Sequence, residues 1–194
     1  MTGKPDEITT EAFIQRLLSP DRARRLDTFG ILTFSEISFR DVVADIGCGP
    51  GFFTIPLAKN LRSGKLYALD LDDQMLDACR DRVDEVRMGN VEVLKCGEYE
   101  FPIEPGSLNG VFLGFVIQAS ADKPKFLNAV RELLKPRGWC TVLEWYRKET
   151  EGGPSLERRL DPEELRAMAQ EAGLEYRSRR ELNNDQYMMT LRNR

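Results

Sequence analysis

Val42-Val43-Ala44-Asp45-Ile46-Gly47-Cys48-Gly49-Pro50-Gly51-Phe52-Phe53 is the stretch that decides the fold. It begins as a short apolar, β-branched run, which is typical of a buried parallel strand. Three glycines at alternate positions interrupt that run, and the segment that begins Phe53-Thr54-Ile55 can start a helix. A glycine turn lets backbone approach a ligand closely, and the start of a helix offers free N–H groups. The stretch therefore predicts a small-molecule site at the carboxyl end of a parallel strand.

The glycine spacing separates the possible ligands. The dinucleotide fingerprint requires glycines at the first, third and sixth positions. Counted from Gly47, the sixth position is Phe52, and Gly51 comes one residue early. A phosphate-binding loop that ends in Lys-Ser or Lys-Thr is also absent from this stretch. The spacing argues against a nicotinamide cofactor, and a nicotinamide-dependent oxidoreductase stays only a third interpretation.

The run D-I-G-C-G-P-G-F, residues 45–52, resembles the first motif of class I S-adenosylmethionine-dependent methyltransferases. The resemblance implies that Asp45 lies near the amino group of the cofactor, because a carboxylate and an ammonium form a charge-assisted pair. An Asp that only caps the next helix is the alternative. The resemblance also implies that the loop wraps the methionine part of the cofactor through Gly47, Cys48, Gly49, Gly51, Phe52 and Phe53.

A second motif follows in Lys65-Leu66-Tyr67-Ala68-Leu69-Asp70, which is typical of a strand that ends in an acid. An acid about 20 residues beyond the glycine turn suits a grip on two ribose hydroxyls, and Asp70 is that acid. The run from Asp70 to Leu76 resembles the D-x-S/D-x-x-M-L pattern of the same family. The resemblance implies that Leu71 and Met75 pack around the adenine, although Met75 could equally be helix core.

The third motif departs from the family pattern. Val91–Lys95 is predicted to be a strand, and Cys96-Gly97-Glu98-Tyr99-Glu100-Phe101-Pro102 follows where relatives carry G-D-A-x-x-L-P. The acid that usually binds the adenine amino group falls on Gly97. Glu98, one residue later, or a backbone carbonyl could take its place.

The fourth predicted strand is Leu108–Val116, and its end carries the expected acceptor side of the site. Gly114 is expected to face the cofactor. Gln118 stands near a position where relatives often have His, so the resemblance implies that it faces the reacting methyl group or the substrate. A loop glutamine without such a role is the alternative. A fifth strand begins near Leu134-Lys135-Pro136-Arg137-Gly138-Trp139, which resembles the family's L-K-P-G-G turn.

Helical patterns fill the gaps between these motifs. Residues 75–86 and 125–134 are amphipathic, and a further helix starts at Pro162 with Asp161 as its N-cap and ends at Ala172-Gly173. Two strands are expected near residues 175–180 and 186–191. The resemblance implies a doubly wound, Rossmann-like α/β fold with seven mostly parallel strands, the last antiparallel. We expect one domain over residues 1–194, with a helical cap in 1–39 and a catalytic core in 40–194.

Bulk properties agree with a single α/β domain. The chain has 194 residues, of which 41% are hydrophobic and 31% charged, ordinary values for a globular protein. It has no apolar run of membrane-spanning length and no apolar export signal at Met1–Glu7, so we expect a cytoplasmic protein. The four cysteines are interpreted as reduced thiols. The formal net charge of −4 argues against broad nucleic-acid binding. A monomer and a homodimer both remain open.

The chain contains no histidine. A Ser-His-Asp hydrolase, a His-activated cysteine enzyme and a His-ligated zinc site are therefore excluded. Methyl transfer tolerates this absence, because the sulfonium donor is already activated and rate can come from in-line positioning. We expect no metal ligands and no requirement for a divalent cation.

The acceptor is expected to be a small molecule that is methylated on oxygen, nitrogen or carbon. The N-P-P-Y tetrad of amino-group methylation is absent, since residues 114–117 are Gly-Phe-Val-Ile. The N-terminal segment is the expected lid, and Phe13, Leu17 and Phe29 could line an apolar acceptor pocket or pack on the sheet. The loop 147–160 is a second candidate wall, or a solvated charged loop.

The segment 144–160 is similar to a methyltransferase subgroup related to the ubiquinone and menaquinone enzymes. The function favoured by these motifs is methyl transfer from S-adenosylmethionine, which leaves S-adenosylhomocysteine as product. The alternative is a non-catalytic binder of either molecule that acts as a sensor or a partner subunit.

Overall fold

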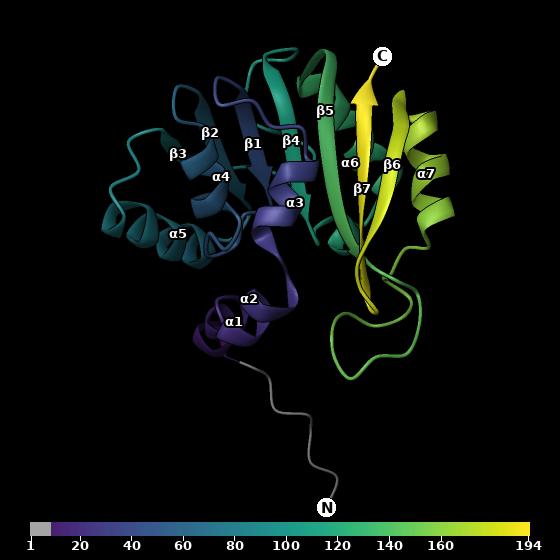
Figure 1. Ribbon diagram of the computed structural model, residues 1–194, viewed down its shortest axis with the longest axis horizontal. Helices are drawn as coiled ribbons and strands as arrows, with labels where there is room; N and C mark the ends of the chain where they lie inside the picture. The colour runs from purple at the N-terminus through teal and green to yellow at the C-terminus, as the bar shows by residue number, and fades with distance from the viewer. Residues whose placement is uncertain (1–8) are drawn as a thin grey trace, which may run out of the picture.

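The computed structural model describes residues 9–194 and contains one seven-stranded sheet (Figure 1). The strands lie in the order β3-β2-β1-β4-β5-β7-β6. Their bounds are β1 Val42–Ile46, β2 Lys65–Asp70, β3 Val91–Lys95, β4 Leu108–Gly114, β5 Leu134–Trp145, β6 Leu174–Asn183 and β7 Gln186–Asn193. Strand β7 is antiparallel to both β5 and β6, whereas the pairs among β1–β5 are parallel. The predicted fold class is confirmed.

Helices cover both faces of the sheet. Their bounds are α1 Thr10–Leu17, α2 Pro20–Arg25, α3 Thr28–Phe34, α4 Thr54–Asn60, α5 Asp73–Glu85, the 3-10 turn η1 Ile117–Ala119, α6 Lys123–Leu133 and α7 Pro162–Glu171. Buried residues of α3 and α4 form one cluster with β1, β2, β4 and β5. Residues of α6 and α7 form another cluster with the strands from β1 to β7. The doubly wound arrangement follows from these two cores.

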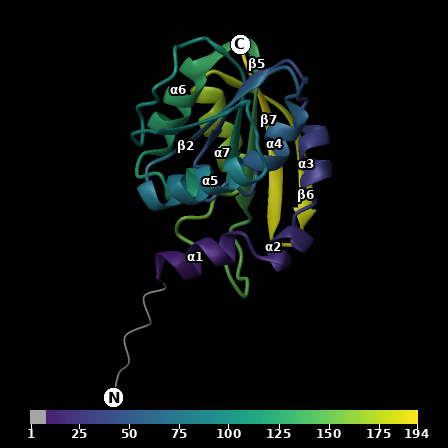
Figure 2. The same ribbon diagram turned by 90° about the vertical axis from the view of Figure 1, so that its left-hand side faces the viewer.

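The predicted cap at residues 1–39 separates into two parts. Helices α1 and α2 lie beneath the carboxyl ends of the parallel strands, and Figure 2 places α1 below α5. Helix α3 instead packs on a sheet face, where Ile31 and Leu32 are buried. The N-terminal end of the expected cap, residues 1–8, lies outside the described residues. The single-domain boundaries stay a prediction.

Helix α2 is fastened to the hairpin turn between β6 and β7. Arg25 pairs with Asp185, with 2.7 Å between Nη2 and Oδ2. The side-chain amide of Asn183 donates to the carbonyl of Arg25 at 3.1 Å, and Leu26 is buried in the core. These contacts hold α2 against the strand ends that carry the site.

The local signals at turns and caps have the expected chemistry. Asp161 caps α7 in a full capping box with Glu164, and Gly173 follows that helix with φ +84°. Arg137, which stands where the family has its first glycine, adopts φ +62°. That left-handed conformation favours glycine, because a side chain strains the backbone in this region.

Candidate functional site

The glycine loop after β1 is fixed by hydrogen bonds to the end of β2. Gly47 N and Cys48 N donate to the carbonyl of Leu69 at 2.8 and 2.9 Å. Gly47 has φ +72°, and a Cβ placed on it would lie 2.5 Å from Val116 Cγ2. The position therefore tolerates only glycine, for conformation and for space.

Gly49 forms the open part of the loop. Its φ is +53°, and a Cβ built on it would meet only Leu17 Cδ1, at 3.7 Å. Its N–H donates to Asp70 Oδ2 at 2.8 Å. The loop thus presents bare backbone in a cradle that a side chain would fill, which is the geometry expected for close approach of a ligand.

Asp70 ends β2 and faces the same loop. Oδ2 accepts the Gly49 N–H, and Oδ1 accepts the N–H of Asp72 at 3.1 Å. An ionised carboxylate offers about four acceptor sites, so lone pairs remain for two hydroxyl donors. The predicted ribose grip is compatible with this arrangement, because the two backbone bonds fix the carboxylate beside the cradle.

Asp45 is buried at the end of β1, with 1% of its surface exposed. The hydroxyl of Thr54, the first residue of α4, donates to its Oδ2 at 2.7 Å. Burial raises the pKa of Asp45 to about 7, although the Thr54 bond lowers it and the charge of Arg22 does too. An ammonium beside Asp45 would favour its ionised form, so the predicted pairing is electrostatically sound.

The other residues predicted to bind cofactor lie around this edge in different environments. Met75 is 7% exposed but belongs to none of the three hydrophobic clusters, whereas Leu71 is 52% exposed. Cys48 is buried. A Cβ on Gly51 would lie 3.0 Å from Cys79 Sγ, and one on Gly114 would lie 2.9 Å from a ring carbon of Phe53.

The loop after β3 is tied to the segment after η1. Glu98 Oε1 accepts from Ser120 Oγ at 2.9 Å and from Ala121 N at 2.8 Å, and the Ala121 bond is the main cause of its lowered pKa. Gly97 N donates to the carbonyl of Glu100 at 2.8 Å. The contacts made by Glu98 are structural, and its role toward adenine stays a prediction.

Four aromatic side chains gather next to the glycine loop. Phe53 lies 4.9 Å from Phe52 and 6.4 Å from Phe115 between ring centroids, and Phe115 lies 6.2 Å from Trp145. Phe52 and Phe53 lie between the glycine loop and α4, Phe115 directly follows β4, and Trp145 is the last residue of β5. Together the four rings form an apolar wall, here called the aromatic wall, beside the cradle.

Phe115 holds an unusual backbone conformation in that wall. Its φ is +66°, which is strained for a bulky residue. Its N–H donates to the carbonyl of Leu143 at 2.9 Å, and its own carbonyl accepts from Gln118 Nε2 at 3.1 Å. Gln118 therefore stabilises the strained turn after β4, which is a role that the sequence did not indicate.

Glu144 binds the segment that follows β4 through a hydrogen bond to Gln118. It is fully buried on β5, and its Oε1 accepts the N–H of Gln118 at 3.1 Å. Its Oε2 has no partner, and neither does the buried Oε1 of Gln118. Burial raises the pKa of Glu144 to about 8, although hydrogen bonding from the backbone N–H groups of Gln118, Trp145 and Ile117 lowers it. Glu144 is thus a carboxyl group that holds its proton near neutrality.

Arg22 of helix α2 is the functional candidate that the sequence reasoning missed. Its guanidinium carbon lies 4.5 Å from the ring centroid of Phe52 and 5.7 Å from those of Phe53 and Phe115. Nη1 donates to the carbonyl of Leu17 at 2.9 Å. A partial signal was present, since Ser19-Pro20 marks a helix start and Arg22 is three residues beyond that cap.

The predicted lid residues have different fates. Leu17 approaches the glycine loop, as its distance to Gly49 shows. The guanidinium carbon of Arg16 lies over the ring of Phe13, 5.0 Å from the ring centroid. Phe29 is 82% exposed, so the expectation that it lines a pocket is wrong. It lies on the outer side of α3, because α3 buries Ile31 and Leu32 instead.

The loop between β5 and α7 is organised around Arg159, whose residue is only 3% exposed. Its guanidinium donates to the carbonyls of Pro154, Lys148 and Gly152 at 2.9, 2.6 and 2.9 Å, and to Thr150 Oγ1 at 2.7 Å. It also lies 5.2 Å from the ring centroid of Trp145. The loop is therefore held together by internal hydrogen bonds, and the solvated-loop alternative does not describe Arg159. Its role as a wall of the acceptor site stays a prediction.

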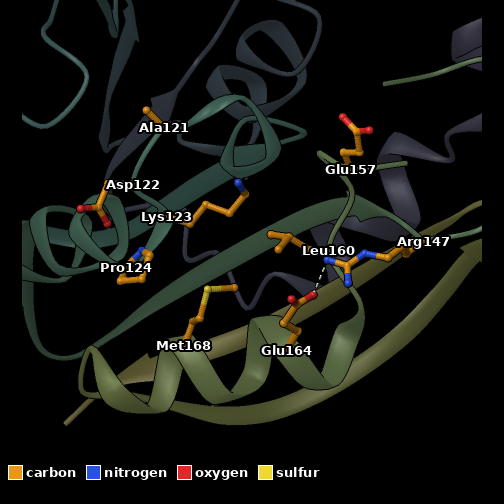
Figure 3. Close-up of a pocket in the computed structure, with 9 residues that line it drawn as sticks. All are labelled: Ala121, Asp122, Lys123, Pro124, Arg147, Glu157, Leu160, Glu164 and Met168. Atoms are coloured by element: carbon orange, nitrogen blue, oxygen red, sulfur yellow. Dashed lines mark hydrogen bonds and ion pairs between the residues drawn. The ribbon is translucent and has the colours of Figure 1, made fainter. Parts of the chain in front are cut away.

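A cavity of about 400 Å³ is lined by residues of this loop together with residues of α6 and α7 (Figure 3). Lys123 points into it, Leu160 and Met168 line it, and Arg147 pairs with Glu164 at 2.6 Å on its rim. None of the predicted cofactor-binding residues lines this cavity, although Arg147, Glu157 and Leu160 of the candidate wall 147–160 do. It is therefore distinct from the cradle at the glycine loop.

Two wider properties concern residues 9–194. Within this range, no group of three or more Cys, Asp or Glu side chains could hold a metal ion. None of the helices there has the length and apolar character that a membrane crossing requires.

Comparison with known proteins agrees with the site geometry. A family model described as a methyltransferase domain matches residues 43–138, from the first strand to the start of the fifth. The demethylmenaquinone methyltransferase of Lactococcus lactis subsp. lactis (strain IL1403) is 29% identical over 124 residues, which are 63% of this chain and 47% of that protein. The carboxy-S-adenosyl-L-methionine synthase of Erwinia tasmaniensis is 30% identical over 147 residues, which are 72% and 58%. The chain spans about half the length of these two relatives.

A solved structure extends the likeness over nearly the whole chain. A SAM-dependent methyltransferase from Aquifex aeolicus matches with a TM-score of 0.89 and 24% identity, and the match covers 96% of this chain and 99% of that one. At this identity the match shows the shared fold, including the strands whose ends carry the cradle and the aromatic wall.

Proposed function

Because the chain belongs to the class I S-adenosylmethionine-dependent methyltransferases, we propose that it transfers a methyl group from this cofactor to a small-molecule acceptor. The observation that carries the proposal is the bond between Gly49 N and Asp70 Oδ2 at 2.8 Å. It joins a bare backbone cradle to a carboxylate with lone pairs to spare. The two features together suit an adenosyl compound with free ribose hydroxyls.

The described residues fit this cofactor. Asp70 would accept from the ribose hydroxyls, and the cradle at Gly47 and Gly49 would receive the methionine part. Asp45 would pair with the amino group, and Met75, Leu71 and Glu98 are the candidates for contact with the adenine. The sulfonium of the cofactor supplies an activated methyl group.

The chain's own contribution to methyl transfer would be positioning. The aromatic wall at Phe52, Phe53, Phe115 and Trp145 excludes water from one side of the cradle and offers π faces to a cationic centre. Gln118 holds the turn of Phe115 through its bond to that carbonyl. Alignment of acceptor, methyl and sulfur can account for rate without a histidine base.

The acceptor is proposed to be small and at least partly apolar, because aromatic side chains form the wall next to the cradle. The relatives named above are a demethylmenaquinone methyltransferase and a carboxy-S-adenosyl-L-methionine synthase, so small-molecule chemistry occurs in this group. The net charge of −4 supports an acceptor other than nucleic acid. A cytoplasmic location is part of the same proposal.

Mass spectrometry of the purified protein and calorimetry would test this function. Co-purified S-adenosylmethionine or S-adenosylhomocysteine, and micromolar or tighter binding of both without NAD binding, are the expected results. A screen of small acceptors with methyl-labelled cofactor would then identify the acceptor by label transfer. Tight NAD binding without S-adenosylhomocysteine binding would overturn the proposal. Tight cofactor binding without transfer to any acceptor would favour the non-catalytic sensor.

A further inference from the structure

Arg22 brings a guanidinium into the site from outside the sheet. Helix α2 lies under the carboxyl ends of the strands, as Figures 1 and 2 show, and Arg22 projects from it over Phe52, Phe53 and Phe115. The ring faces stabilise the charge, and the carbonyl of Leu17 accepts one of its hydrogen bonds. An arginine has five N–H donors, so most of its donor capacity is unused by these contacts.

No carboxylate of residues 9–194 forms an ion pair with Arg22. Arg24 and Arg25, its neighbours on the same short helix, both have carboxylate partners. Asp45 is the acid that interacts electrostatically with Arg22, but burial raises the pKa of Asp45 to about 7. A partly buried cation without a full counter-charge is costly, and a bound anion would relieve that cost.

Contacts of helix α2 with the rest of the protein hold Arg22 in place. Its helix is held to the β6–β7 turn through the Arg25–Asp185 pair and the Asn183 amide. Leu17, whose carbonyl accepts from Arg22, also approaches Gly49 of the cradle. The guanidinium is therefore held between the cradle and the aromatic wall, where both the cofactor and the acceptor would lie.

We propose that Arg22 is the carboxylate-binding residue of this site. The inference rests on the proposed function, since it assumes that the cradle binds an S-adenosyl compound. A planar guanidinium matches a carboxylate in a two-bond fork, which a lysine cannot reproduce. The carboxylate could come from the methionine part of the cofactor or from an acidic acceptor against the aromatic wall.

Calorimetry with a cofactor analogue distinguishes the two sources. The probes are S-adenosylhomocysteine and its decarboxylated analogue, measured on the wild-type protein, Arg22→Met and Arg22→Lys. If the cofactor supplies the carboxylate, the wild type prefers S-adenosylhomocysteine by about 10- to 100-fold, Arg22→Met loses the preference, and Arg22→Lys retains part of it.

If an acceptor supplies the carboxylate, Arg22→Met binds S-adenosylhomocysteine like the wild type. The wild-type complex with S-adenosylhomocysteine then binds benzoate more tightly than benzamide, and Arg22→Met abolishes that difference. Arg16→Met is the matched control, because Arg16 is a cap arginine that lies over Phe13 instead of the aromatic wall. Thermal melting checks that each variant is folded.

Two results would overturn the inference. The first is a folded Arg22→Met that discriminates both probe pairs as the wild type does. The second is a wild type that binds S-adenosylhomocysteine but discriminates neither pair. A wild type that binds no S-adenosylhomocysteine at all would instead overturn the proposed function, and the inference with it.

Discussion

The cradle and the aromatic wall meet at the same edge of the sheet but are assembled in different ways. The cradle comes from loop residues 47–49 and from Asp70, and its key bonds join backbone N–H groups of that loop to the end of the adjacent strand. The aromatic wall collects side chains from the segment before α4 and from the ends of β4 and β5, and the guanidinium of α2 packs against it. One region depends on backbone conformation and the other on side-chain identity.

The difference predicts how the two regions respond to substitution. A cradle made of backbone fails when a side chain is added, because the ligand loses close approach. A wall made of side chains can change one member and keep its general shape. Side chains added to the cradle should therefore cause the largest loss of cofactor affinity, whereas substitutions in the wall should mainly affect the acceptor.

Gly49→Val should produce the largest effect. A β-branched residue at φ +53° strains the loop by about 1–2 kcal/mol, and its side chain fills the cradle. We expect S-adenosylhomocysteine affinity to fall by more than about 100-fold in calorimetry. Gly89→Val is the matched control, because a Cβ there meets nothing within 4 Å. Unchanged affinity in a folded Gly49→Val protein would place the ligand elsewhere.

Asp70→Ala should weaken S-adenosylhomocysteine by about 1.5–3 kcal/mol, the usual loss for hydrogen bonds to a charged group. The substitution also leaves the Gly49 N–H without its acceptor, Oδ2 of Asp70. Asp70→Asn should cost less, since one acceptor remains. Isothermal calorimetry on both variants gives the order. If Asp70→Ala binds like the wild type, Asp72 becomes the candidate for the ribose grip.

Glu144→Gln should change the pH dependence of stability. The folded-state pKa of about 8 lies above the ordinary glutamate value of 4.5, so the folded state binds the extra proton. The contribution of Glu144 to the free energy of unfolding is fully present below the pKa that this residue has in the unfolded chain, and it is lost as pH rises toward 8. The slope is at most about 1.4 kcal/mol per pH unit.

Urea unfolding of the wild type and Glu144→Gln across this window measures the slope. The interval from pH 7 to 8 isolates Glu144 best. Below pH 7, Asp45, with a pKa of about 7, changes the free energy of unfolding in the same direction. Glu98→Gln is a useful contrast, since the pKa of Glu98 is lowered and its effect belongs to acid pH. Parallel wild-type and Glu144→Gln curves would mean that Glu144 is ionised in the folded protein.

Gln118→Ala should have the smallest effect and separate the two regions most clearly. It removes the bond that holds the Phe115 carbonyl, so we expect kcat/KM to fall by about 2- to 10-fold. S-adenosylhomocysteine affinity should stay nearly unchanged. Gln170→Ala, an exposed position on α7, is the control. A loss of cofactor affinity as large as the loss of transfer would show that the wall and the cradle act as one unit.

The same contrast explains what the sequence could predict. Gly47, Gly49 and Asp70 belong to local patterns with fixed spacing, so their arrangement at one sheet edge was predictable before the fold was known. Arg22 carries no such pattern, because its aromatic partners lie 30 or more positions away along the chain. Its role depends on the packing of α2 against the β6–β7 turn, and that contact is tertiary.

Phe29 and Arg159 show the same limit in opposite directions. The apolar character of Phe29 predicted a buried position, yet α3 turns Ile31 and Leu32 inward and leaves Phe29 at the surface. The charge of Arg159 was compatible with a solvated loop, yet five acceptors of its own loop surround it. Burial of a single side chain depends on which face its neighbours take, and composition alone does not specify it.

The loop around Arg159 has a consequence for diversification. Four of its five acceptors are backbone carbonyls, and every residue type supplies a carbonyl. Outward-facing side chains between residues 148 and 158 can therefore be exchanged without dismantling the loop, as long as Arg159 remains. This segment is a natural place to build a library of sequence variants on an unchanged scaffold.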